Sequence, residues 1–193
     1  MQKGKVKQMV AVSMLSTIAY VLMMLDFPFP GLPAFLKIDF SEVPALLAAI
    51  IFGPAAGIMV EAIKNMLHYG IVGSFTGVPV GELANFIAGT LFILPVSYMF
   101  RNKNTVKQLS IGLIAGTVLM TLMMGLLNYL IILPAYTWFL GAEQMSSQMM
   151  LDFILKGITP FNLIKGTIIT LLFVSLFTRL QPWVLKQISS QQA

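Results

Sequence analysis

The sequence contains no cysteine and only one histidine, His68. Without cysteine, the chain can form no disulfide framework, no thiolate metal site and no cysteine nucleophile. The single histidine has no second imidazole with which to share a metal ion. For His68 we therefore expect an interfacial or packing role and not a catalytic one.

Charged residues are also scarce, because they make up only 10% of the 193 residues, whereas 58% are hydrophobic. Soluble domains carry about 25% charged residues. A mean hydropathy of +0.87 leaves this chain too little polar surface to face water. We therefore predict an integral membrane protein, and we interpret the net charge of +5 as a sign of membrane topology and not of a nucleic-acid partner.

Nucleotide-binding and hydrolytic motifs are missing from the sequence. A P-loop would read G-x-x-x-x-G-K-[ST], but "LIKGTI" places lysine before glycine and lacks the earlier glycine. H-E-x-x-H and G-x-S-x-G are missing as well. We expect neither an enzyme nor a cofactor, and a partner would have to supply the energy for any transport.

The apolar runs predict an all-α membrane protein with a single domain of six transmembrane helices, residues 1–193. The expected helices are 8–25, 42–53, 54–70, 79–100, 108–133 and 160–180, with outer loops at 26–41 and 134–159. The connection 134–159 is expected to be partly helical.

Prolines and glycines mark the expected helix ends. Pro28, Pro30, Gly31 and Pro33 cannot continue the first helix. The next apolar run is too long for one straight span, and Gly53-Pro54 divides it. The fifth helix is expected to stop at Pro134. Ser41 and Glu42 form a plausible N-terminal cap for the second helix.

The basic residues predict the orientation of the chain. With six spans, eight of the twelve basic residues fall on the side of the two termini: Lys3, Lys5, Lys7, Arg101, Lys103, Lys107, Arg179 and Lys186. Cytoplasmic loops carry such an excess of lysine and arginine. Both termini are therefore predicted to be cytoplasmic, with the two outer loops together on the opposite side.

Polar residues inside the predicted spans are the strongest functional signal. They are Glu61, Lys64, Asn65, Glu82, Asn85, Asn128, Asn162 and Lys165. Buried charges in spans are costly and usually face the protein interior. The predicted orientation places most of these residues in the outer halves of four helices, at a similar depth. A ligand pocket near the outer face would require this convergence.

Structural roles for the same residues stay open at this stage. Lys165 could extend its long side chain to the outer headgroups. Glu61 and Lys64 could pair with each other, three residues apart. Asn128 and Asn162 could simply cross-link helices.

The residues expected around these polar side chains are aromatic, and the charges at this depth balance. The aromatic residues are Phe35, Phe40, Tyr136, Trp138 and Phe161, and the intramembrane charges of Glu61, Lys64, Glu82 and Lys165 sum to zero. These surroundings suit a flat, largely uncharged ligand that forms hydrogen bonds. An interfacial belt of aromatic residues is the alternative.

The first helix offers a face for packing against another chain. Ser13 and Thr17 stand four residues apart, with Ser16 and Ala19 alongside. Small residues at this spacing allow helices to approach closely. We expect Ser13 and Thr17 at a partner interface.

Four segments resemble the riboflavin-specific S components (RibU type) of energy-coupling factor (ECF) vitamin transporters. They are "FPFPGLPAFLKIDFSEVPALLAAIIFGPAAGIMVEAIKNMLHYG", "GVPVGELANFIAGTLFILP", "LNYLIILPAYTWF" and "PFNLIKG", and the resemblance extends from about residue 8 to 183. It implies a six-helix subunit of the bacterial plasma membrane. Such subunits bind one vitamin near the extracellular face and associate with a T subunit and two ATPase subunits that power import.

The resemblance also implies roles for single residues. Asn128 and Lys165 would bind the polar edge of the isoalloxazine ring. Leu36, Lys37 and Asp39 would close over the ligand. Glu82 and Asn85 would face the pocket or the ribityl chain, and Asn162 joins this predicted site by its depth. The family's helix-one contact uses an alanine-xxx-alanine pattern, which Ser13 and Thr17 would replace here.

Two functions follow from these observations. The first is a riboflavin-binding membrane subunit of an ATP-driven ECF importer. The alternative is an autonomous facilitator or proton-coupled carrier of a small solute, in which Glu61 or Glu82 would be the proton site.

Overall fold

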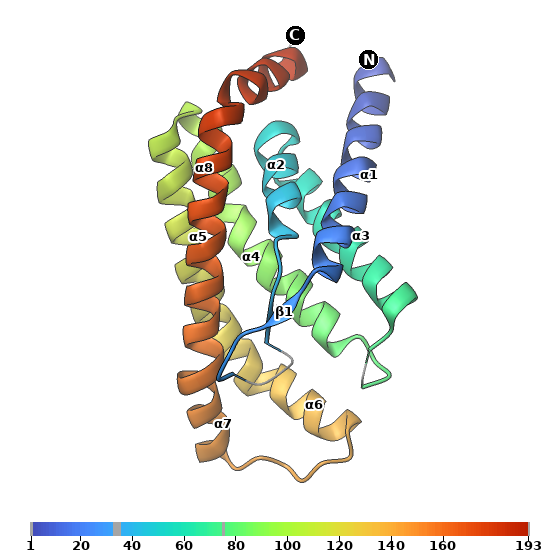
Figure 1. The fold of residues 1–193 in the computed structure, drawn as a ribbon, viewed down its shortest axis with the longest axis vertical. Coiled ribbons are helices and arrows are strands. Elements are labelled where there is room, and N and C mark those ends of the chain that lie inside the picture. The colour runs from blue at the N-terminus through green and yellow to red at the C-terminus, as the bar shows by residue number, and fades with distance from the viewer. Residues whose placement is uncertain (1, 33–35, 75, 193) are drawn as a thin grey trace.

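The computed structural model describes residues 2–32, 36–74 and 76–192, so Pro33 and Phe35 of the predicted loop lie outside it. Helices dominate the described chain (Figure 1). In order, the elements are α1 (Gln2–Met24), β1 (Phe27–Pro28), β2 (Lys37–Ile38), α2 (Glu42–Phe52), α3 (Pro54–Val72), α4 (Val80–Lys103), α5 (Val106–Leu127), the π-helical turn η1 (Asn128–Ile132), α6 (Leu133–Phe139), α7 (Ser147–Phe153), the π-helical turn η2 (Ile154–Ile158) and α8 (Thr159–Gln192).

The first helix ends before the proline-rich stretch, as predicted. The loop that follows is tied together by two residues of antiparallel pairing, with Phe27 opposite Ile38 and Pro28 opposite Lys37. This pairing joins the two ends of the loop and leads the chain directly into α2.

The predicted break at Gly53-Pro54 is confirmed. Gly53 has φ of 107°, a conformation that favours glycine, and Pro54 occupies the first position of α3, where a missing N–H costs nothing. A Cβ atom on Gly53 would also collide with the guanidinium of Arg101 on α4. The backbone conformation therefore favours glycine at this corner, whereas the long Arg101 side chain could move away from an added Cβ atom.

The predicted ends of the fifth and sixth helices are wrong. Pro134 does not stop the fifth helix, because the helical chain continues through η1 into α6 and ends at Phe139. Pro134 lies in the first turn of α6, where proline is tolerated. The sixth helix begins earlier than residue 160 and ends later than residue 180, since α7, η2 and α8 form one run from Ser147 to Gln192.

α8 continues past its predicted end and includes Pro182. This proline lies inside the helix, and Figure 1 shows the last part of α8 turning toward α1. Proline removes one backbone hydrogen bond and kinks a helix without always ending it. The turned segment reaches the first helix, where Lys7 Nζ donates to Gln187 Oε1 at 3.2 Å.

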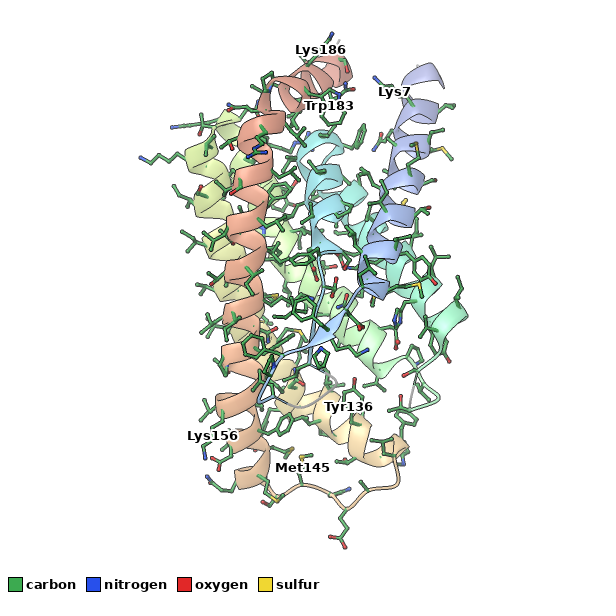
Figure 2. The ribbon with its side chains drawn as sticks, in the orientation of Figure 1. Lys7, Tyr136, Met145, Lys156, Trp183 and Lys186 are labelled. Carbon is green, nitrogen blue, oxygen red and sulfur yellow. The ribbon has the colours of Figure 1, made fainter. Side chains whose placement is uncertain are left out.

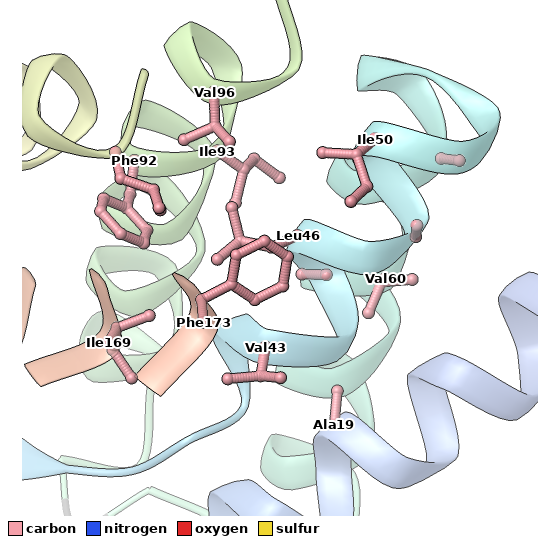
Figure 3. Close-up of a cluster of buried hydrophobic side chains, with 14 of the residues drawn as sticks. Ala19, Val43, Leu46, Ile50, Val60, Phe92, Ile93, Val96, Ile169 and Phe173 are labelled. Carbon is pink, nitrogen blue, oxygen red and sulfur yellow. The ribbon is translucent and has the colours of Figure 1, made fainter. Parts of the chain in front are cut away.

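The core lies where α2, α3, α4 and α8 meet (Figure 3). Leu46 and Ile50 of α2 face Ile93 and Val96 of α4, and Phe173 of α8 closes the cluster. Nearer the terminal end, Phe100 and Phe177 make an edge-to-face contact with ring centroids 5.2 Å apart. This core joins the elements that carry the polar residues of interest.

Glycines bring α5 close to α4. A Cβ atom on Gly112 would lie 2.8 Å from the Cα of Val96, and one on Gly116 would collide with the carbonyl oxygen of Phe92. This is the close approach that small residues four apart permit between membrane helices.

Within the part of the chain that the structure describes, four helical stretches are long and apolar enough to cross a membrane: Lys5–Met24, Val80–Arg101, Val106–Phe139 and Ser147–Ser190. α2 is apolar but has only 11 residues. α3 has 19 residues, but Glu61, Lys64 and Asn65 are buried on it and lower its hydropathy. The two termini lie at the same end of the molecule, and α6 and α7 lie toward the other end (Figure 1).

Candidate ligand-binding cavity

A cavity of about 820 Å³ lies between the first loop, α3, α4, α5 and α8. Small-molecule sites typically measure about 300–1,000 Å³. All eight residues predicted to bind substrate line this cavity: Leu36, Lys37, Asp39, Glu82, Asn85, Asn128, Asn162 and Lys165. The fold thus brings together residues that are as many as 129 positions apart in the sequence, Leu36 and Lys165.

Lys165 is fixed inside the protein by two carboxylates. Its Nζ lies 2.8 Å from Glu42 Oε1 and 3.1 Å from Asp39 Oδ2, and the residue is only 7% exposed. The alternative in which Lys165 extends to the lipid headgroups is therefore wrong, because its ammonium group finds its partners within the chain.

Lys64 belongs to the same group of charges. Its Nζ lies 2.9 Å from Glu61 Oε2, as the three-residue spacing predicted, and 3.8 Å from Glu42 Oε1. Glu42 is thus the carboxylate shared by both lysines. We call Asp39, Glu42, Glu61, Lys64 and Lys165 the buried charge network.

Ser41 occupies the N-cap position of α2 and Glu42 lies in its first turn, as predicted, but the side chains have other partners. The Ser41 side chain makes no capping hydrogen bond to α2. Instead its hydroxyl accepts a 2.6 Å hydrogen bond from Lys64 Nζ, and Glu42 pairs with both lysines. A buried ammonium group attracts nearby oxygens more strongly than the first peptide N–H groups of a short helix do.

The buried charge network does not have the net charge of zero that was predicted for the intramembrane charges. The charge network contains three carboxylates and two ammonium groups. The balance of zero counted Glu82, which lies elsewhere in the cavity, and omitted Asp39 and Glu42. Asp39 lies in a loop and Glu42 at a helix start, so neither was counted among the charges inside the predicted spans.

Asp39 precedes α2 and lies outside the membrane-spanning helices. Burial raises the pKa of its carboxyl group, but the nearby charges of Lys165 and Lys64 and hydrogen bonds from Ser41 lower it further, so the net pKa is about 2. The Ser41 backbone N–H donates to Asp39 Oδ1 at 2.8 Å. Asp39 is therefore ionised throughout the neutral range.

Asparagines supply the uncharged polar groups of the cavity. Asn128 Nδ2 donates to the Met124 carbonyl on its own helix at 2.7 Å, so this bond does not cross-link helices. Asn85 Oδ1 is buried without a hydrogen-bond partner among the described residues. Asn65, by contrast, does not line the cavity and bonds to the Glu61 carbonyl at 2.8 Å.

His68 has a polar partner that the sequence analysis missed. Its Nδ1 lies 3.2 Å from Glu82 Oε1, and both residues line the cavity. The interfacial or packing role expected for His68 thus gains a specific polar contact with the next helix. A signal was present, because Glu61, Lys64 and His68 follow one another at spacings of three and four residues, which places them on one face of a helix.

The aromatic residues divide between the two expected roles. Tyr136 and Phe161 line the cavity, and Figure 2 shows Tyr136 on α6, at the end opposite the termini. Trp138 is 80% exposed and stacks on Phe139, so it belongs to the outer surface and not to the cavity wall. Phe40 is partly buried against the hydrophobic core.

The face of α1 predicted to contact a partner points away from the core. Ser13 and Thr17 are exposed, whereas Ser16 and Ala19 are buried. The Thr17 hydroxyl donates to the Ser13 carbonyl at 3.1 Å, so its polar group is satisfied within the helix.

Apolar helices of spanning length around an internal polar cavity define a multi-pass membrane protein with room for a small molecule. The sequence profile of the ECF transporter substrate-specific component matches residues 7–177, and the chain belongs to this family. It is thus a transport component and not an enzyme.

Two relatives extend over nearly the whole chain. The chain is 57% identical over 186 residues to riboflavin transporter FmnP of Bacillus subtilis, covering 96% of this chain and 98% of the relative. It is 43% identical over 174 residues to riboflavin transporter RibU of Staphylococcus aureus, covering 90% of each.

A solved structure has the same fold. It is described as the S component of a bacterial ECF transporter, and it matches with a TM-score of 0.79 and 42% sequence identity, covering 93% of this chain and 98% of the other.

Proposed function

We propose that the chain binds riboflavin in the 820 Å³ cavity and is the substrate-binding subunit of an ECF-type importer. The observation that carries the proposal is the convergence of Asn128, Asn162 and Lys165 on one cavity. Two relatives at 57% and 43% identity are named riboflavin transporters, which supports the choice of ligand.

The chemistry of the cavity suits an isoalloxazine ring. The pyrimidine edge of this ring presents two carbonyl acceptors on either side of an N–H donor. Amide side chains can both donate and accept hydrogen bonds, whereas a lysine ammonium group only donates. Asn128, Asn162 and Lys165 therefore offer the mixture of groups that this edge requires, and Phe161 and Tyr136 offer apolar contact for the ring.

The first loop would close the site over the ligand. Leu36, Lys37 and Asp39 line the cavity from this loop. Lys37 pairs with Asp26 at 2.9 Å, and Asp39 pairs with Lys165 on α8. These two ion pairs hold both ends of the loop in place above the proposed ligand.

Six spans with both termini in the cytoplasm would place the cavity near the extracellular face. α2, with 11 residues, and α3 would supply the two spans beyond the four long apolar stretches. Figure 2 shows Lys7 and Lys186 at the end where the termini lie, and an excess of basic residues is typical of the cytoplasmic side. The two relatives come from bacteria, which supports the bacterial plasma membrane as the location.

Import would need a T subunit and two ATPase subunits. The sequence has no P-loop of its own, and the family is the substrate-specific component of a transporter. The exposed face of α1 around Ser13 and Thr17 is the proposed contact with the T subunit.

Riboflavin binding to the full chain, purified in detergent, tests the proposal. Riboflavin fluorescence should be quenched in a saturable way, with one ligand per chain. A protein that neither carries nor quenches riboflavin would overturn the proposal. Vesicles containing the chain alone should bind riboflavin but not accumulate it, and accumulation driven by a proton gradient would support the autonomous carrier instead.

A further inference from the structure

We infer that Glu82 makes the cavity discriminate between a flavin with a free terminal hydroxyl group and the same flavin carrying a 5′-phosphate. The inference rests on the proposed function and deepens it, because it names the class of ligand that the site rejects. Glu82 would thus determine specificity at the end of the ligand that carries the ribityl chain.

Glu82 has one carboxylate oxygen available for a ligand. Its Oε1 lies 3.2 Å from His68 Nδ1, but its Oε2 is buried and has no hydrogen-bond partner among the described residues. The residue is only 8% exposed and lines the cavity. An unpaired buried carboxylate oxygen costs free energy, so a ligand that donates a hydrogen bond to it is favoured.

This oxygen distinguishes a hydroxyl group from a phosphate group. An ionised carboxylate only accepts hydrogen bonds, and a hydroxyl group can donate one. A phosphate monoester carries a charge of about −1.5 to −2 at pH 7, and its oxygens act mainly as acceptors. It therefore leaves Glu82 without a donor and adds repulsion between two negative groups.

The lysines of the cavity are already paired. Lys165 lies between Glu42 and Asp39, at 2.8 Å and 3.1 Å, and Lys37 lies 2.9 Å from Asp26. The described cavity lining contains four carboxylates and two ammonium groups: Asp26, Asp39, Glu42, Glu82, Lys37 and Lys165. With neutral His68 this is a formal excess of two negative charges, so a phosphate finds no unpaired lysine there.

The position of Glu82 on its helix adds to the effect. Glu82 lies in the first turn of α4, and Gly81 beside it also lines the cavity. The N-terminus of a helix carries a partial positive charge and would favour an anion. Glu82 places a carboxylate at this point, and its removal should therefore make the same end of the cavity more favourable for a phosphate.

The experiment compares three ligands on the full chain purified in detergent: riboflavin, riboflavin 5′-phosphate and an uncharged riboflavin 5′-acetate. For the wild-type protein, we expect the phosphate to bind at least about 10-fold more weakly than riboflavin, and the acetate to bind more tightly than the phosphate, because like charges repel. Since all three ligands share one ring, the comparison isolates the terminal group.

Variants then assign the discrimination to Glu82. Glu82→Gln should reduce the ratio of the two dissociation constants, phosphate over riboflavin, by about 10-fold. Glu82→Asp keeps the charge and should preserve most of the discrimination. Glu143→Gln removes the same charge from an exposed position outside the cavity and should keep the wild-type ratio.

Several results would overturn the inference. One is a Glu82→Gln protein that binds flavin with the wild-type ratio. Another is a wild-type protein that binds the acetate as weakly as the phosphate, which would show that charge repulsion is not the cause. This comparison needs no variant to fold. Equal binding of phosphate and riboflavin would overturn this inference alone, whereas a failure to bind any flavin would also overturn the proposed function.

Discussion

Lys165 Nζ lies 3.1 Å from Asp39 Oδ2, although the two residues are 126 positions apart in the sequence. Asp39 lies at the end of the first loop and Lys165 on α8, so this ion pair joins the loop to the last helix. Because both residues line the cavity, the same contact holds the fold together and shapes the proposed ligand site.

Replacement of Lys165 should affect both stability and binding. Lys165→Ala removes the ion-pair partner of Asp39 and the nearer of the two lysines that pair with Glu42. Loss of one partner of a buried pair costs about 3–5 kcal/mol. Riboflavin binding should weaken by about 1–3 kcal/mol where the variant folds, because a hydrogen bond from a charged group is lost. Thermal unfolding and flavin titration measure the two effects.

Lys156 provides the control for this variant. It pairs with Asp152 at 2.9 Å, but both side chains are at least half exposed. Lys156→Ala should change the unfolding free energy by less than about 1 kcal/mol and leave flavin binding unchanged. Equal effects of the two substitutions would contradict the structural role assigned to Lys165.

Asn162 should contribute to binding more than to stability. Asn162→Ala removes an amide that lines the cavity, and we expect riboflavin affinity to fall by about 1–3 kcal/mol. Asn65→Ala is the matched control, because Asn65 is buried but does not line the cavity. Asn65→Ala should lower the melting temperature and leave the riboflavin affinity of the folded protein unchanged.

The contribution of Asp39 to stability should depend on pH. The folded-state pKa of Asp39 is lowered from 3.8 to about 2. Stability from its ionised form is fully present above pH 3.8 and is lost as the pH falls through about 2. The difference in unfolding free energy between wild type and Asp39→Asn should therefore stay constant from pH 8 to pH 5.

Below pH 4 the same difference should shrink, by roughly 2 kcal/mol on complete protonation. Chemical denaturation of both proteins over the pH series measures it. A difference that changes between pH 8 and pH 5 would show that Asp39 titrates there and would contradict its pairing with Lys165.

Gly116 should tolerate no side chain. A Cβ atom there would collide with the carbonyl oxygen of Phe92 on α4, which is backbone and cannot rotate away. Gly116→Ala should destabilise the protein by about 1–3 kcal/mol, the usual cost of overpacking. Gly70→Ala on α3 has open space around it and should be neutral or slightly stabilising. Thermal unfolding in detergent compares the two variants.

The exposed face of α1 should be needed for assembly but not for binding. Ser13→Leu and Thr17→Leu enlarge two outward-facing side chains, so the proposed T subunit should no longer pack closely against them. Co-purification with the T subunit and riboflavin uptake should fall, while flavin binding to the isolated chain stays unchanged. Ser175→Leu, on the exposed face of α8, is the control and should leave assembly intact.

Local chemistry explains why several features could be predicted from the sequence. Apolar runs require burial or lipid, and Gly53-Pro54 cannot continue a straight helix, so the break between α2 and α3 followed directly. Because the helix rise per residue is constant, the positions of Asn128, Asn162 and Lys165 along their helices predicted a shared depth. The family resemblance added Leu36 and Lys37 on the loop, which depth could not supply.

Other features depend on contacts that no local pattern contains. Pro134 was expected to end a helix, but the preceding π-helical turn allows the chain to continue. Glu42 lies at the start of α2, as expected, but its pairing with two lysines from α3 and α8 was not predicted. His68 was expected to have an interfacial or packing role, and its partner, Glu82 from the next helix, was not predicted.

By itself, the sequence determined the membrane class and the absence of a nucleotide motif, because both depend on composition and local motifs. It also determined the apolar helices and the polar residues predicted at one depth, because these depend on spacing along the chain. Only the tertiary structure decided which charges meet. An ion pair forms between residues that packing brings within about 4 Å, whatever their separation in sequence. That is why Lys165, predicted to meet either lipid headgroups or a ligand, is found between Asp39 and Glu42.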